Sequence, residues 1–125
     1  MSSAIENLID LLLKDEAAFQ SAASRTSNRD WRSMFEEYAI QRREFAQQLK
    51  PFLATSAPHR AAPPLPLAIA DDRQLVEELI HSGNRTLTAI RNAISVNESD
   101  DAYAVLKEQA AEVANVIEQL ISFNS

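Results

Sequence analysis

Two charged residues on apolar helix faces are the strongest candidates for chemistry in this 125-residue chain. Glu16 and Arg42 each stand where hydrophobic spacing predicts the buried stripe of an amphipathic helix. A charge inside a protein is strongly destabilising unless it is paired. In an antiparallel hairpin that turns near Thr26, the two residues come within reach of each other. We therefore predict a buried polar group of Glu16, Arg42 and the Tyr38 hydroxyl with a structural role, or else an Arg42 that extends to the rim.

A second candidate is Glu78-Leu-Ile-His81, which has the Glu-x-x-His spacing of some helical metal sites. Helical geometry places both side chains opposite the apolar stripe, so we interpret them as solvated. Glu16, Glu78 and His81 are weak metal candidates, and we predict no bound metal and no cofactor. His81 also suggests a phosphorelay or adaptor module, but the phosphotransfer motif has Lys three and Gly four residues further on. Here those positions hold Asn84 and Arg85.

No other set of residues has the spacing of a catalytic site. The chain has no cysteine, and its two histidines are His59 and His81. Neither histidine has the neighbours of a Ser-His-Asp arrangement, and there is no glycine-rich phosphate loop. The sequence therefore leaves enzymatic activity open but favours a protein without it.

Composition narrows the class of protein further. A single glycine and many good helix formers predict an all-α domain. The net charge of -6 argues against a nucleic-acid partner, since such proteins need a cationic surface. We find neither a signal-peptide pattern nor an apolar run of the ~20 residues needed to cross a membrane. We expect a cytoplasmic protein that has no membrane partner.

Hydrophobic spacing predicts four amphipathic helices, at about 3–23, 28–53, 72–96 and 100–123. We expect Pro51 to end or kink the second helix. Gly83 should face inward on the third helix and admit a bulky neighbour, such as an aromatic residue of the second. The fourth helix has apolar residues at three-four spacing, which predicts a bundle seam: Tyr103, Leu106, Ala110, Val113, Ile117 and Leu120.

Residues 54–71 form a linker that holds four of the five prolines. As an extended chain at ~3.1 Å per residue, this linker spans roughly 50 Å. The second helix is about 40 Å long, so the linker can return along the whole bundle. The sequence therefore predicts one domain, residues 1–125, that is a four-helix bundle with a crossover between its second and third helices. The alternative is a simple up-down-up-down bundle with a slack loop.

The stretch 35–49, Phe-Glu-Glu-Tyr-Ala-Ile-Gln-Arg-Arg-Glu-Phe-Ala-Gln-Gln-Leu, carries a resemblance to known proteins. Together with the hairpin 5–49 and the helix 77–94, it resembles a small bacterial four-helix-bundle family of the ferritin-like superfamily. That resemblance implies a di-iron site built from Glu on two helices and Glu-x-x-His on the other two. Glu16 matches the first-helix ligand. The matching positions on the later helices hold other residue types: Tyr38 and Gln41, Gly83 and Leu87, Ala110 and Val113.

The di-iron ligand set is therefore missing, and apolar surface is the best remaining functional feature. Leu11, Leu13 and Ile40 lie outside the predicted core stripes. Pro63 and Pro66 belong to an Arg-x-x-Pro-x-x-Pro pattern, which is typical of SH3 ligands but also of stiff linkers. We predict a non-catalytic bundle that binds itself, as a homodimer, or another protein. A metal-binding ferritin-like protein with a degenerate site is the alternative.

Overall fold

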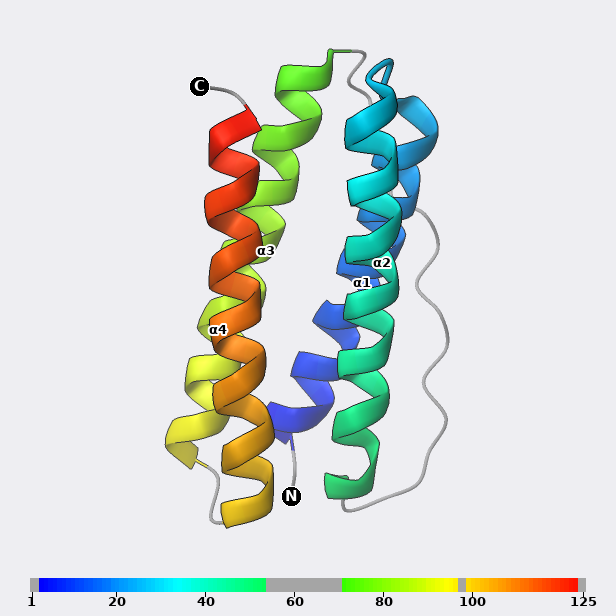
Figure 1. Cartoon of the computed structure of the whole chain (residues 1–125). Helices are drawn as coiled ribbons and strands as arrows, with labels where there is room; N and C mark the ends of the chain where they lie inside the picture. Colours follow the sequence, from blue (N-terminus) through cyan, green and yellow to red (C-terminus); the bar gives the residue numbers. More distant parts are fainter. Residues whose placement is uncertain (1–2, 54–70, 97–98, 124–125) are drawn as a thin grey trace.

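The structure, a computed structural model, is a bundle of four long helices (Figure 1). It describes residues 3–53, 71–96 and 99–123. The helices are α1 (Ser3–Arg25), α2 (Arg29–Leu49), α3 (Asp72–Val96) and α4 (Asp100–Phe123). None of these described helices is long and apolar enough to cross a membrane. The prediction of an all-α four-helix bundle is confirmed.

The helix ends follow from local side chains. The Asn28 side chain accepts hydrogen bonds from the backbone nitrogens of Asp30 and Trp31, at 3.0 and 3.1 Å, and so caps the start of α2. At the other end of α2, the chain tightens into a 3-10 turn, η1 (Lys50–Phe52). Pro51 lies in this turn, where its missing N–H cannot continue the α-helix. The predicted second helix therefore ends as an α-helix at Leu49, four residues earlier than expected.

The direction of the helices shows a crossover connection. The Ser27 hydroxyl, just before α2, donates a 2.9 Å hydrogen bond to the Asp72 carboxylate at the start of α3. Both helices therefore begin at the same end of the bundle and run parallel. In Figure 1, α1 and α4 run upward while α2 and α3 run downward. The crossover prediction is confirmed, and the up-down-up-down alternative is wrong.

The connecting residues 54–70 lie outside the described residues, and with them Pro63 and Pro66 of the possible partner surface.

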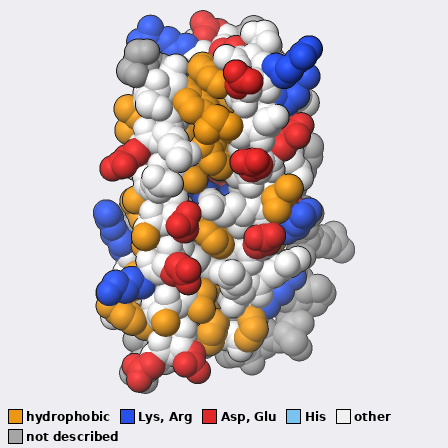
Figure 2. Space-filling model, viewed as in Figure 1, with side chains coloured by type: hydrophobic (Ala, Val, Ile, Leu, Met, Phe, Trp, Pro, Cys, Tyr) orange, Lys and Arg blue, Asp and Glu red, His pale blue; other side chains and the backbone are white. Residues whose placement is uncertain are grey.

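The interior has two apolar clusters, one toward each end of the bundle. One of them is rich in aromatic rings: Phe19 packs on Phe35 and Tyr38, while Trp31 of α2 stacks on Phe123 of α4 with centroids 5.0 Å apart. Of the neighbouring helix pairs, α2 and α4 are the least closely packed. Figure 2 shows hydrophobic side chains gathered between these two helices in the upper half of the molecule.

The buried face of α4 differs from the predicted seam by a small rotation. The residues that reach the core at three-four spacing are Ala102, Leu106, Gln109, Val113, Val116 and Leu120. Tyr103, predicted to be buried, is 45% exposed. Four residues of the predicted seam are buried as expected: Leu106, Val113, Ile117 and Leu120. The prediction was wrong at Tyr103 and Ala110, because the bundle turns the neighbouring Ala102 and Gln109 inward instead.

Gly83 faces inward, as predicted, but its neighbour is aliphatic. A Cβ atom at this position would lie 2.9 Å from Cγ1 of Ile117 on α4. Real Cβ atoms essentially never approach so closely, so glycine is required for α3 and α4 to pack at this distance. The expected aromatic neighbour from α2 is replaced by Ile117.

We expect Gly83→Ala to lower the free energy of unfolding by about 1–3 kcal/mol, because the added methyl overpacks the core. In an Ile117→Ala background the same change should instead be neutral or stabilising by up to about 1 kcal/mol, which is the helix-propensity gain of alanine. Denaturant unfolding of the wild type, both single variants and the double variant measures this coupling. Equal effects of Gly83→Ala in both backgrounds would contradict the close approach.

Candidate functional site

The centre of the bundle holds a buried charge pair, Arg42 of α2 and Asp15 of α1. The Arg42 side chain has no exposed surface, and that of Asp15 is 2% exposed. Nε of Arg42 lies 3.3 Å from Oδ2 of Asp15 and donates a hydrogen bond to it. Arg42 is therefore buried and paired as predicted, but its partner is Asp15 and not Glu16.

Glu16 lies next to Asp15 in sequence but about 100° further round the helix. Its carboxylate forms an ion pair with the half-exposed Arg43 guanidinium at 3.7 Å, at the edge of the α1–α2 contact. The Tyr38 hydroxyl was also predicted to join Glu16 and Arg42. It instead donates its hydrogen bond to Oε1 of Gln119 on α4. The predicted trio thus divides into three separate interactions.

Two hydroxyl groups of α3 complete the surroundings of the Asp15 carboxylate. Ser82 donates a hydrogen bond to Oδ1, and Thr86 donates one to Oδ2 at 2.6 Å. Both donors are buried and lie one turn apart on the face of α3 that meets α1. The carboxylate therefore receives hydrogen bonds from α2 and α3, which compensate for part of the hydration it loses.

The Arg42 guanidinium is satisfied less completely. Nη1 donates a 2.7 Å hydrogen bond to Oε1 of the adjacent Gln41. The guanidinium carbon lies 5.4 Å from the centroid of the Phe19 ring, which provides a cation–π contact. Nη2 is buried and has no hydrogen-bond partner in the described part of the chain. The carboxylate of the pair therefore receives three hydrogen bonds, while one nitrogen of the guanidinium, Nη2, makes none to the described residues.

Burial dominates the titration of both groups. It raises the pKa of Asp15 above its ordinary value, while Arg42, Ser82 and Thr86 each lower it by smaller amounts. Burial likewise lowers the pKa of Arg42, and Asp15 opposes this change. Because neither side chain reaches the surface, the pair cannot touch a dissolved substrate. The interactions of the pair are therefore confined to the helices that hold it.

Gln109 is another buried polar residue that the sequence did not indicate. Its Nε2 donates hydrogen bonds to the backbone oxygen of Phe45 and to Oε1 of Gln48, at 3.2 and 3.1 Å. Its own Oε1 is buried and accepts no hydrogen bond from the described residues. Together with the contact between Tyr38 and Gln119, these amides connect α2 to α4, the least closely packed pair.

The predicted metal candidates do not form one site. Glu78 and His81 are both exposed on α3, as their spacing predicted, while Glu16 is paired with Arg43. Within the described ranges, no three His, Cys, Asp or Glu side chains come together as metal ligands. The Glu-x-x-His motif is therefore a pair of solvated residues on an outer helix face.

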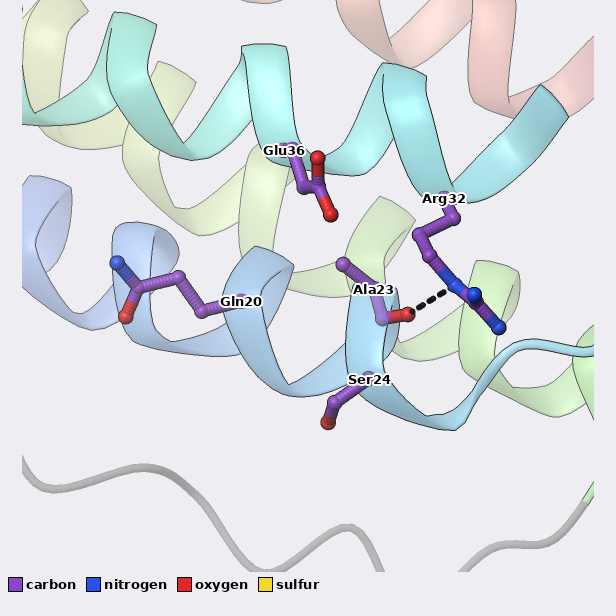
Figure 3. Close-up of a pocket in the computed structure, with 5 residues that line it drawn as sticks. All are labelled: Gln20, Ala23, Ser24, Arg32 and Glu36. Atoms are coloured by element: carbon purple, nitrogen blue, oxygen red, sulfur yellow. Dashed lines mark hydrogen bonds between the residues drawn. The ribbon is translucent and has the colours of Figure 1, made fainter. Parts of the chain in front are cut away.

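A surface hollow lies where α1 ends and α2 begins (Figure 3). It has a volume of about 460 Å³ and is lined by Gln20, Ala23, Ser24, Arg32 and Glu36. Arg32 does not project freely into it, because Nε and Nη2 donate hydrogen bonds to the backbone oxygens of Ala23 and Thr26, each at 3.1 Å. These are carbonyls of the last turn of α1 and the residue after it, so Arg32 caps this helix.

The predicted partner surface is only partly free. Leu11 and Leu13 are half-buried and pack in part against the apolar core, so their place in that surface stays a prediction. Ile40 is 46% exposed on α2, as predicted. Three further large apolar side chains are exposed among the described residues, on α3 and α4: Val96, Tyr103 and Ile121.

Comparison of the chain with protein families, curated proteins and solved structures finds no significant match. The structure itself establishes the fold as a four-helix bundle with one crossover and a buried charge pair. The relationship to ferritin-like proteins stays a prediction.

We expect Arg42→Met to lower the free energy of unfolding by about 3–5 kcal/mol, because it leaves the Asp15 carboxylate buried without its counter-charge. Arg43→Met is the matched control and should cost less than about 1 kcal/mol, since its ion pair with Glu16 is half-exposed. A double variant, Asp15→Leu with Arg42→Met, should be less destabilised than Arg42→Met alone. Denaturant unfolding distinguishes these outcomes, and equal losses for Arg42→Met and Arg43→Met would refute the buried pair.

We also expect the Asp15 carboxyl to titrate above the ordinary aspartate pKa of 3.8. Between the two pKa values the folded protein holds a proton that the unfolded chain has released, so the contribution of Asp15 to stability falls as pH rises through that window. Carbon-13 NMR of labelled aspartate measures the midpoint. Arg42→Met should raise it further, because the guanidinium lowers the Asp15 pKa. A wild-type midpoint below 3.8 would mean that Arg42 and the hydroxyls outweigh burial.

Proposed function

We propose that this protein is a non-catalytic helical bundle that acts by binding protein chains, either its own copy or another protein. The observation that carries the proposal is the contrast between its interior and its surface. The polar groups that converge at mid-bundle are used to hold three helices together, whereas large apolar side chains stay exposed. Exposed aromatic residues such as Tyr103 are enriched in protein interfaces, where apolar surface is buried on binding.

We also propose that the bundle descends from a ferritin-like protein whose metal ligands have been replaced. Two features support this: the single crossover between α2 and α3, and the polar group of Asp15, Arg42, Ser82 and Thr86 inside the bundle. An arginine in that place supplies a fixed positive charge to the carboxylate, as a metal ion would. Metal binding by a degenerate site is the competing proposal, with Glu16, Glu78 and His81 as its remaining candidates.

Elemental analysis of protein purified from its native cell separates these proposals. A protein-binding bundle should contain iron, manganese and zinc far below one atom per chain. A stoichiometric metal that is lost in Glu16→Gln or His81→Gln would overturn the non-metal proposal.

Partner binding is tested by photo-cross-linking in the native cell. A benzophenone amino acid in place of Ile40 or Tyr103 should form a defined adduct, identified by mass spectrometry, with another protein or with a second copy. The same amino acid in place of Thr88, an exposed polar residue of α3, is the matched control and should give none. Where Ile40 forms the adduct, Ile40→Asp should weaken binding of the purified partner by at least about tenfold in calorimetry. Identical patterns at all three positions would contradict the proposal.

A further inference from the structure

Helix α4 carries a second line of residues at bundle spacing, beside the line that faces the core. Its members recur at alternating steps of four and three, which places them on one flank of the helix. We call this line the outer seam of α4: Tyr103, Lys107, Ala110, Ala114, Ile117 and Ile121.

The residues at the two ends of the outer seam are exposed, and those at its middle are small. Tyr103 and Ile121 are 45% and 53% exposed, and they lie about 27 Å apart along the helix. Between them, Ala110 and Ala114 are small and half-buried. They pack in part against the apolar core, and their small size lets another helix approach the surface that stays exposed. Only Ile117 is buried within the bundle, against Gly83.

The order of residues along the outer seam is self-complementary. Tyr103 and Ile121 lie nine residues on either side of Glu112, and Ala110 and Ala114 lie two residues on either side. When two copies of α4 pair antiparallel about this midpoint, each Tyr103 meets the Ile121 of the other copy. Each Ala110 likewise meets an Ala114. A two-fold interface needs this property, because the same patch must fit itself.

Two charged residues on the solvent edge of the seam come within one residue of the same symmetry. Lys107 lies five residues before the midpoint and Glu118 six residues after it, and both are exposed. Helical geometry places them on the same edge of the seam, the edge that faces solvent. An antiparallel two-fold keeps equivalent edges together, so Lys107 of one copy faces Glu118 of the other, twice. Such pairs fix the orientation of helix pairing, and an acidic chain gains most from placing its few cations opposite carboxylates.

We propose that the outer seam of α4 binds the α4 of a second copy of this chain, antiparallel, to form a two-fold symmetric dimer. This inference rests on the proposed function, which it makes specific by naming the partner and the surface. Tyr103 and Ile121 form the apolar ends of the interface, the alanines its close-packed centre, and Lys107 with Glu118 its charged edge.

Analytical ultracentrifugation of the full chain between about 1 and about 300 µM tests the dimer. The wild type should dimerise, and Tyr103→Glu should raise the dimer dissociation constant at least about tenfold. Thr88→Glu is the matched control, since it places the same charge on an exposed position of α3 outside the seam. Circular dichroism confirms that each variant keeps its helices. A wild type that stays monomeric at every concentration, or a dimer equally weakened by both variants, would overturn the inference.

A charge exchange tests the orientation of the pair. Lys107→Glu should weaken the dimer, and adding Glu118→Lys to the same chain should restore it, because the opposite charges again face each other. Restoration is a result that a merely structural role of Lys107 would not produce. Failure of the double variant to recover dimerisation would refute this register.

Cross-linking gives an independent measure, because the chain has no cysteine of its own. Chains with Tyr103→Cys mixed with chains with Ile121→Cys should be joined by a short bis-maleimide, while either variant alone should not. Cross-linking of one variant to itself would indicate a parallel pair and refute the inference. A chain that fails these tests yet forms the Ile40 adduct still binds proteins through another surface, so the inference fails while the proposed function stands. Stoichiometric metal would have the opposite meaning: the proposed metal-free function would fail, while the dimer would still be judged by its own tests.

Discussion

The removal of one carboxylate and one guanidinium from water is the constraint on which the middle of the bundle depends. Either charge buried there without a partner would strongly destabilise the fold, so the neighbouring helices must supply partners at fixed positions along the bundle axis. Helix α1 supplies Asp15, α2 supplies Arg42, and α3 supplies the hydroxyls of Ser82 and Thr86. A shift of α3 by one residue would rotate both hydroxyls by about 100° and leave Asp15 short of donors. The group therefore specifies the register of three helices more than it adds stability.

This use of polar residues determines what the surface can offer. The polar groups that converge at mid-bundle are enclosed by the helices. The hydrogen bonds of Tyr38 and Gln109 connect α2 with α4. Helix α4 carries two lines of residues in one sequence. Its inner line closes the bundle, and its outer seam, one step round the helix, carries apolar and small residues that the described bundle leaves partly exposed. A helix with two such lines is suited to bridge its own core and a neighbouring molecule.

The sequence predicted the helices and their crossover because both depend on features of single segments: hydrophobic spacing, proline content and the length of a linker. It did not predict the partner of Arg42, because that depends on which flank of α1 meets α3. Large apolar residues dominate the predicted buried arcs. The alanines that follow Asp15 by three and seven residues, Ala18 and Ala22, are also buried and extend the buried arc of α1 toward Asp15. The same bias placed Tyr103, rather than Ala102, in the core of α4.

The crossover also separates the charge pair from its hydroxyl donors along the chain. Asp15 and Arg42 belong to the hairpin of α1 and α2, whereas Ser82 and Thr86 belong to the hairpin of α3 and α4. Each hairpin forms through contacts that are local in sequence, so each can assemble before the two meet. In the first hairpin alone, the carboxylate still faces water on the side that α3 will cover. Docking of the second hairpin then exchanges that water for two hydroxyl groups, and only the native alignment provides both.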